Sequence, residues 1–255
     1  MTPVVRALLI ANVAAFFVQS ALGELANAFV FVPSLALVRP WTIVTYMFLH
    51  GDPMHLLFNM MALFFFGPRV EERILSRQFA ILYFLSGITG ALLSMIFSPG
   101  SPIIGASGGV FGVMLAFAWF WPHEKIFIWG VLPVPARMLV IFTTVLALWS
   151  GFGGAGDGIA HFGHLGGYLG AVLYLRWLER KRLAFKRRAT TAPSEVVRRA
   201  ANYQAIDLAR VHEVNREEIA RIIDKINAQG IGSLTLQEAA FLANFVPPDA
   251  PGAKP

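Results

Sequence analysis

The sequence predicts an all-α, polytopic membrane protein: a bundle of six transmembrane helices followed by a small helical appendage in the cytosol. Three observations lead to this prediction. Of the 255 residues, 56% are hydrophobic and only 14% are charged, whereas soluble domains carry about 25% charged residues. Six apolar segments approach the roughly 20 residues that a membrane-spanning helix needs. Lys and Arg are concentrated at alternate ends of these segments, which is typical of a defined membrane topology.

The predicted spans follow from the runs of apolar residues along the chain. The first is expected to be a retained helix rather than a cleaved signal peptide, because further spans follow it and the charge pattern stays consistent. The six spans are residues 4–22, 53–75, 79–97, 104–121, 136–153 and 160–178.

The distribution of basic residues predicts the orientation of these spans. The loops 23–52, 98–103 and 154–159 contain Arg39 as their only basic residue. The positive-inside rule therefore places these loops outside and both chain termini in the cytosol. The basic residues expected on the cytosolic side are Arg6, Arg69, Arg73, Arg77, Lys125, Arg137, Arg176, Arg180, Lys181 and Arg182.

The composition changes after the last predicted span. Residues 1–178 form the predicted membrane domain, 179–205 a basic juxtamembrane segment and linker, 206–245 a small helical cytosolic tail, and 246–255 a Pro-rich disordered end. The basic segment is expected to lie against anionic lipid headgroups as a stop-transfer anchor. Its members are Arg180, Lys181, Arg182, Lys186, Arg187 and Arg188.

Two patterns predict helices in the tail. Ile219, Ile222, Ile223 and Ile226 recur at helical spacing. Thr235 precedes Leu236-Gln237-Glu238 and is expected to cap the N-terminus of a second short helix.

The composition also excludes several classes of chemistry. The chain has no Cys, so it has no disulfide, no thiolate metal site and no Cys nucleophile. The net charge of +6 reflects the basic residues at the cytosolic ends of the spans, and no nucleic-acid partner is expected.

Strongly polar side chains inside predicted spans are candidates for function, because they are costly at membrane depth. His55 and Asn59 lie four residues apart just after Pro53, so they project from one face of a helix. Two neutral hydrogen-bond donors there could stabilise an oxyanion. They could equally be a helix-packing pair that bonds to a neighbouring backbone.

A serine flanked by glycines opens the fourth predicted span. In Gly105-Ala106-Ser107-Gly108-Gly109 the hydroxyl is unhindered and lies near a helix N-terminus, where backbone N–H groups are free. The pattern alone is weak, because Ser and Gly also serve close helix packing in membranes.

Two histidines near the start of the last span, His161 and His164, could act as a base or share a metal. A metal site would need a third ligand, for which Asp157 and His55 are the only plausible additions, and no metal is expected.

Glycine spacing connects the serine to these histidines. Small residues four apart let transmembrane helices approach closely, and such contact would bring Ser107 within reach of His164 as a nucleophile–base pair. Asp52 and Asp157 are loop residues, so a Ser–His dyad is preferred to a triad. The glycine pairs are Gly105/Gly109, Gly108/Gly112, Gly163/Gly167 and Gly166/Gly170.

Several motifs together resemble the rhomboid family of intramembrane serine proteases, over residues 4–178. These are Trp41 to Glu72 with Phe48-Leu49-His50, His55-xxx-Asn59 and Gly67-xxx-Glu71; Phe79-xxx-Tyr83-xxx-Gly87; Gly105-Ala106-Ser107-Gly108 with Phe111-Gly112; and Ala160-His161-xx-His164-x-Gly166-Gly167.

The resemblance implies an intramembrane serine endopeptidase with Ser107 as nucleophile and His164 as general base. His164 is preferred to His161 because Gly167 follows it by three residues. His55 and Asn59, with the Ser107 N–H, would form the oxyanion hole. His161, Gly105, Gly108 and Gly167 would be supporting positions.

The implied partners are single-pass or polytopic transmembrane protein substrates, cut near the outer membrane face after a small residue, and membrane lipids. No cofactor is implied, and the implied location is a bacterial cytoplasmic membrane. The family often carries Trp-Arg where this chain has Trp41-Thr42, and Arg39 is a candidate replacement for that arginine.

Two other functions remain open at this point. One is a catalytically inactive, rhomboid-like scaffold that binds membrane proteins. The other is a metal or proton transporter built around His50, His55, His161 and His164. If the chain is a protease, the loop 151–158 and the aromatic residues Phe142, Trp149 and Phe152 are candidates for a cap and a lateral gate, or else an ordinary connector and lipid-facing side chains.

Overall fold

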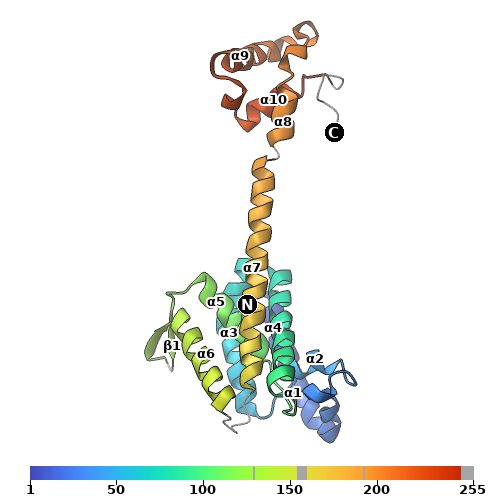
Figure 1. The fold of residues 1–255 in the computed structure, drawn as a ribbon, viewed down its shortest axis with the longest axis vertical. Helices are drawn as coiled ribbons and strands as arrows, with labels where there is room; N and C mark the ends of the chain where they lie inside the picture. The colour runs from blue at the N-terminus through green and yellow to red at the C-terminus, as the bar shows by residue number, and fades with distance from the viewer. Residues whose placement is uncertain (129, 154–159, 192, 248–255) are drawn as a thin grey trace. The chain divides into compact units, whose positions relative to one another are not determined.

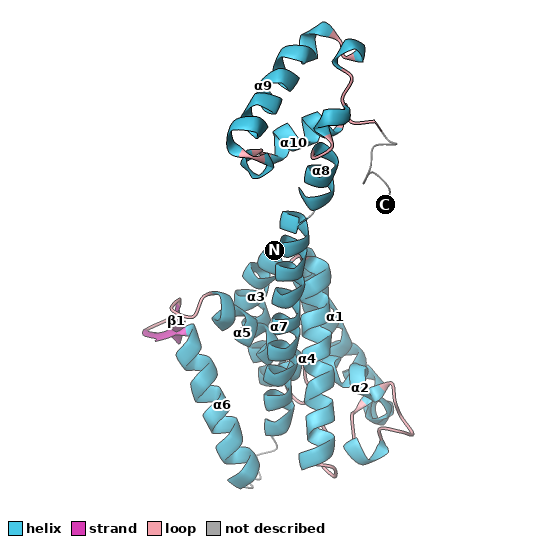
Figure 2. Cartoon of the chain, turned by 45° about the horizontal axis from the view of Figure 1, so that its top comes forward, coloured by secondary structure: helices cyan, strands magenta, loops and turns pink. Residues whose placement is uncertain are grey.

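The computed structural model describes residues 1–128, 130–153, 160–191 and 193–247. The chain divides into two compact units, Met1–Leu178 and Glu179–Pro255. Both are mainly helical (Figures 1 and 2). Several predictions fall outside the described residues: Asp157, the predicted outer loop 154–159, most of the candidate cap and the end of the chain from 248. The side chains of Arg182 and residues 184–195 are also outside them.

One helix lies over each predicted span of the first unit. The helix α6, which covers the fifth predicted span, lies at the edge of the bundle in both ribbon views (Figures 1 and 2). The last helix continues well past the predicted end of its span at 178. The helices are α1 (Pro3–Leu22), α3 (Pro53–Ile74), α4 (Ser76–Phe97), α5 (Ser107–Phe120), α6 (Ala136–Gly153) and α7 (His161–Thr191).

Three segments among the described residues are long and apolar enough to cross a membrane: Pro3–Phe29, Ser76–Phe97 and Ala136–Gly153. The α5 helix is apolar but has only 14 residues. The number of six spans therefore stays a prediction.

The start of α1 is tied to the end of α3 through a buried carboxylate. Glu71 is 2% exposed, and it accepts hydrogen bonds from the backbone N–H groups of Val4 and Val5 at 3.0 and 2.9 Å. The hydroxyls of Thr2 and Ser76 donate to it at 2.5 and 2.6 Å. The first N–H groups of a helix have no partner within the helix, so Glu71 satisfies those of α1 from another element.

Glycines bring α7 into close contact with both α4 and α5. A Cβ atom on Gly167 would overlap the carbonyl oxygen of Gly108, which places α7 directly against α5. A Cβ on Gly166 would meet the backbone of Thr89 and Gly90 in α4. The predicted contact between the serine and histidine helices is therefore present through Gly108 and Gly167, while Gly166 faces a different helix.

Two regions contain structure that the sequence analysis did not predict. The loop 23–52 holds three short 3-10 helices, η1 (Gly23–Phe29), η2 (Pro33–Leu35) and η3 (Tyr46–Phe48), and the one-turn α2 (Thr42–Thr45). Trp41 Nε1 donates to the Ala28 carbonyl at 2.9 Å and Thr42 Oγ1 to that of Arg39 at 2.6 Å. An antiparallel hairpin, β1 (Lys125–Ile128) and β2 (Leu132–Pro135), joins α5 to α6.

The second unit has a core of its own, built from α8 (Pro193–Ala200), α9 (Glu213–Gln229) and α10 (Leu236–Ala243), with the 3-10 turns η4 (Tyr203–Ala205), η5 (Leu208–Arg210) and η6 (Ile231–Ser233). Residues 179–205 were predicted to be a basic juxtamembrane segment and linker, and the helices α7 and α8 occupy most of this segment. Ala200 is buried with Ile219, Ile222 and Leu242, so α8 belongs to the appendage.

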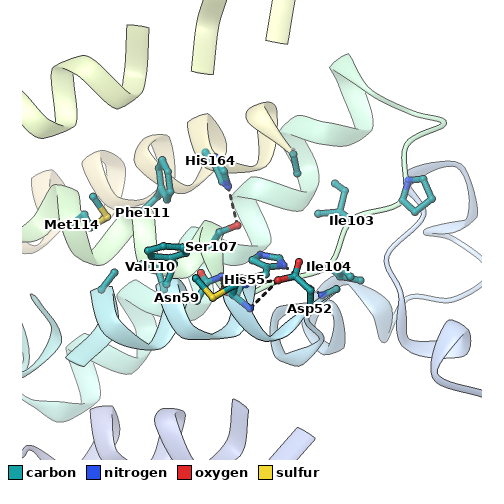
Figure 3. A pocket seen from close by; sticks show the side chains of 16 residues that line it. Asp52, His55, Asn59, Ile103, Ile104, Ser107, Val110, Phe111, Met114 and His164 are labelled. Carbon is teal, nitrogen blue, oxygen red and sulfur yellow. Dashed lines mark hydrogen bonds between the residues drawn. The ribbon is translucent and has the colours of Figure 1, made fainter. Parts of the chain in front are cut away.

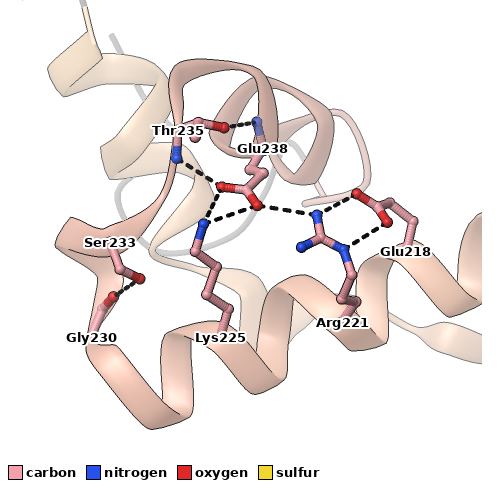
Figure 4. A network of polar contacts seen from close by, with 7 residues as sticks. All are labelled: Glu218, Arg221, Lys225, Gly230, Ser233, Thr235 and Glu238. Atoms are coloured by element: carbon pink, nitrogen blue, oxygen red, sulfur yellow. Dashed lines mark hydrogen bonds and ion pairs between the residues drawn. The ribbon is translucent and has the colours of Figure 1, made fainter.

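The predicted cap of the last helix is confirmed. Thr235 accepts a hydrogen bond from the Glu238 N–H, and the Glu238 carboxylate accepts one from the Thr235 N–H. The same carboxylate pairs with Lys225 at 2.8 Å and Arg221 at 3.1 Å, which links α10 to α9 (Figure 4).

Candidate active site

A cavity of about 660 Å³ brings the predicted site residues together. Its walls come from α3, α5, the start of α7 and the segment before α5. Figure 3 shows Ser107 between His164 on one side and His55 and Asn59 on the other. All four side chains line the cavity.

Ser107 is the first residue of α5, and a special backbone geometry precedes it. Gly105 has φ +120°, a conformation that side chains of L-residues rarely adopt. Its N–H donates to the Tyr46 carbonyl at 2.9 Å. No side chain caps the start of α5, and the Ser107 N–H is one of the first amides of the helix, which lack partners within it. A hydroxyl and an available amide therefore meet at one point.

His164 lies one turn into α7, and its Nε2 is 2.9 Å from Ser107 Oγ. The imidazole stacks on the Phe111 ring, with centroids 4.0 Å apart and planes 15° apart. The Phe111 ring in turn packs against the Tyr168 ring, with centroids 5.2 Å apart. The ring is therefore held flat against α5 with one nitrogen directed at the hydroxyl. This is the geometry a base needs to take the proton of a serine nucleophile.

His161 is buried beside His164, with the two rings edge to face and their centroids 6.5 Å apart. No group of three or more His, Asp or Glu side chains converges on one point in the described part of the chain. Of the two histidines, it is His164 that hydrogen-bonds to Ser107 Oγ.

His55 is oriented by the turn that starts α3. Asp52 caps the helix by accepting from the N–H groups of Met54 and His55 at 2.8 and 2.9 Å. The Gly51 N–H lies 3.5 Å from His55 Nδ1, a long hydrogen bond. A neutral imidazole that accepts at Nδ1 carries its proton on Nε2. A Cβ on Gly105 would lie 2.7 Å from His55 Nε2 and 3.8 Å from Ser107 Oγ, so this donor faces the serine.

Asn59 follows one turn later on the same face of α3 and is 6% exposed. Its amide nitrogen donates to the His55 carbonyl at 2.9 Å. That bond uses one of its two amide hydrogens.

The family model for the rhomboid domain matches residues 38–181, more than half of the chain. This chain belongs to the rhomboid family. The matched segment contains Ser107, His164, His55 and Asn59.

Three relatives from different organisms are similar to this rhomboid chain. It is 34% identical over 143 residues to Rhomboid-like protease 3 of Toxoplasma gondii. It is 36% identical over 131 residues to Rhomboid protease GluP of Bacillus subtilis (strain 168), and 36% over 135 residues to Rhomboid protein 1, mitochondrial, of Saccharomyces cerevisiae. The matches cover 56%, 51% and 50% of this chain. They span 53%, 24% and 38% of the respective relatives, so about half of their length or less.

The rhomboid domain and the apolar helices identify an integral membrane protein. The relatives come from bacteria and eukaryotes alike, so the expected bacterial type stays a prediction.

Two residues next to this rhomboid site, His50 and Gln19, were not assigned to the protease site from the sequence, although His50 was named for the transporter alternative. His50 is fully buried, and its ring meets the His55 ring edge to face at 5.1 Å. Burial and, secondly, the neighbouring His55 lower the pKa of His50 to about 4. Gln19 of α1 hydrogen-bonds to both main-chain polar groups of His50. The signal for Gln19 was present in the sequence: it is a strongly polar residue in an apolar span.

Proposed function

We propose that this chain is an intramembrane serine endopeptidase that cleaves transmembrane proteins through a Ser107–His164 dyad. The observation that carries the proposal is the 2.9 Å contact between His164 Nε2 and Ser107 Oγ, in a cavity that also holds two candidate oxyanion donors. Membership of the rhomboid family, and relatives named as proteases, support the same function.

The proposed reaction follows from the positions of these groups. His164 Nε2 takes the Ser107 proton as Oγ attacks the carbonyl carbon of the scissile peptide bond. The negative charge on the carbonyl oxygen is stabilised by His55 Nε2–H, the Asn59 amide and the Ser107 N–H. His164 then gives its proton to the departing amine, which leaves an acyl-enzyme on Ser107. Water, deprotonated by His164, hydrolyses the ester and regenerates the hydroxyl.

The substrates we propose are single-pass or polytopic membrane proteins, cut near the outer membrane face. The supporting feature is the place of the cavity in the chain: it is formed by the starts of α3, α5 and α7, which the topology prediction puts on the side opposite the cytosolic termini.

The decisive experiment replaces the nucleophile. Purified wild-type protein in proteoliposomes should cleave a transmembrane substrate and react with a fluorophosphonate probe. Ser107→Ala should do neither, because the acyl-enzyme cannot form. Ser101→Ala is the control, since Ser101 is an exposed serine outside the cavity lining. Equal turnover by wild type and Ser107→Ala would refute the proposal.

The same experiment separates the protease from an inactive scaffold of the same fold. A scaffold would bind a membrane protein but leave Ser107 unlabelled by the probe, because it has no activated serine. The contact between Ser107 Oγ and His164 Nε2 favours the enzyme.

A further inference from the structure

The first helix reaches the candidate oxyanion site through one side chain. Gln19 lies near the end of α1, and its amide bonds to both main-chain polar groups of His50, 31 residues away. Nε2 donates to the His50 carbonyl at 2.5 Å, and Oε1 accepts from the His50 N–H at 3.0 Å. Two bonds to one residue fix both the position and the rotation of the backbone there, as in a pair of β-strands.

His50 belongs to a loop, so no regular element holds it. It follows η3, which ends at Phe48, and precedes α3, which begins at Pro53. Main-chain groups in such a segment need partners from elsewhere when they are removed from water. For His50 the Gln19 amide supplies both.

The position of this segment determines how His55 is oriented. The buried His50 ring packs edge to face on the His55 ring. The next residue, Gly51, directs its N–H at His55 Nδ1, the bond that leaves the proton on Nε2. On the Gly105 side there is no room even for a Cβ. The imidazole is thus confined between the 50–51 segment and Gly105.

We propose that Gln19 is a positioning residue for the oxyanion donor: it fixes the backbone of His50, and thereby the ring of His55. This inference rests on the proposed function, because His55 matters as a donor only if an oxyanion forms. Gln19 does not touch the reacting atoms. Its role is to keep the 50–51 segment in place while charge develops near Nε2.

The test uses Gln19→Met, which keeps the length of the side chain and removes both hydrogen bonds. Misplacing a catalytic group by about 1 Å can cost about 10²-fold in rate, so kcat for a transmembrane substrate should fall by about 10- to 100-fold while KM stays the same. The matched control is Ser20→Ala. Ser20 neighbours Gln19 and is exposed, and within the described part of the chain its hydroxyl bonds to the Phe16 carbonyl of its own helix, so its loss should leave kcat unchanged.

A second variant distinguishes positioning from general stability. If Gln19 acts through His55, Gln19→Met should add no further loss of kcat in a His55→Ala background. Independent effects would multiply, because separate sites contribute additively to free energies. Multiplying losses, or a kcat for Gln19→Met equal to that of Ser20→Ala, would overturn the inference.

Hydrogen exchange gives a readout that does not depend on activity. The His50 amide should exchange faster in Gln19→Met than in wild type or Ser20→Ala, because it loses its acceptor. Unchanged exchange would also overturn the inference. If Gln19→Met does not fold, Gln19→Glu, which keeps the acceptor and removes the donor, should show the same changes in smaller degree.

Failure of the proposed function looks different from failure of this inference. If the wild type were no more active than Ser107→Ala, both the proposed function and the role of Gln19 would be refuted. If the wild type were active, Ser107→Ala inactive and Gln19→Met as active as the wild type, only the role of Gln19 would be refuted.

Discussion

Residues around the cavity have little freedom of position, and Gly105, next to the lining residue Ile104, is the clearest case. It combines φ +120° with a site where a Cβ would lie 2.7 Å from the His55 ring. Gly105→Ala should therefore displace the imidazole and strain the backbone before Ser107. Because losing one oxyanion donor costs about 10²–10³ in kcat, we expect a loss of at least about 10²-fold in steady-state assays.

The control for Gly105 is a nearby loop glycine. A Cβ on Gly100 would meet no atom within 4 Å, so Gly100→Ala should keep wild-type kcat. Similar rates for the two alanine variants would contradict the assigned geometry.

His50 predicts a pH dependence of stability. Its pKa in the folded protein is lowered to about 4, mainly by burial and then by His55, with Asp52 acting in the opposite direction. The unfolded chain, with a pKa of about 6.5, binds the proton more readily. The free energy of unfolding should therefore be highest above pH 6.5, where both states are unprotonated at His50. It should decrease as the pH falls toward 4, because the unfolded chain takes up the proton first.

This decrease can be measured as the thermal unfolding midpoint between pH 7 and pH 4. His50→Phe has no titrating ring and should show a shallower dependence over that interval. Parallel curves for wild type and variant would show that His50 is not responsible.

At this scale the sequence predicted most of what the structure brings together. Ser107, His164, His55 and Asn59 could be found because each is polar in an apolar span. His50 was named for the transporter alternative but not for the protease site, because it lies in a loop and its burial beside His55 depends on how 23–52 folds. The contact between Gln19 and His50 could not be predicted, because the Gln19 side chain bonds to the His50 main chain, and main-chain groups carry no residue-specific pattern.

Among the elements, the contact between α5 and α7 decides whether the dyad exists. Gly167 lies against the Gly108 carbonyl oxygen, a backbone atom that cannot rotate away. Gly167→Ala should push the two helices apart and lengthen the Ser107–His164 contact. We expect kcat and the rate of fluorophosphonate labelling to fall together by at least about 10²-fold, since misplacement by about 1 Å suffices for such a loss.

A matched control lies on the same helix. A Cβ on Gly163 would meet Ala160 and Ser94 at 3.4 and 3.7 Å, which are ordinary contacts. Gly163→Ala should therefore keep most of the activity. Alanine is the better helix former of the two residues, so helix propensity favours both variants. Equal damage by Gly163→Ala and Gly167→Ala would contradict the role assigned to the close approach at Gly167.

Helix positions were predictable because apolar runs of this length indicate spans directly. The helix that each glycine contacts could not be predicted from the sequence. Gly166 and Gly167 are adjacent, yet one faces α4 and the other α5, because neighbouring residues on a helix point about 100° apart. The β1–β2 hairpin was missed because its eight residues contain two prolines, Pro133 and Pro135, which disfavour strands.

For the whole molecule, the two units have separate cores. Glu238 tests their independence. Its pKa is lowered to about 2, chiefly by Lys225, so its pairing stabilises the tail above about pH 4.5 and is lost as the pH falls toward 2. Glu238→Gln should speed hydrogen exchange in α9 and α10 of the full-length protein near neutral pH, while fluorophosphonate labelling of Ser107 stays at the wild-type rate.

The control for Glu238 is Glu217→Gln. Glu217 is exposed on α9 and forms no ion pair with the described residues, so exchange should not change. Slower labelling of Ser107 in Glu238→Gln would show that the tail influences the membrane unit.

The Glu71 carboxylate has a consequence for biogenesis. It binds the first turn of α1 across 67 residues of sequence, so during translation that helix leaves the ribosome long before its partner is made. Until the C-terminal end of α3 arrives, the amides of Val4 and Val5 have only water or headgroups to bond. The start of α1 is thus completed only once the end of α3 has been made, and a fusion joined directly before Thr2 would interfere with that step.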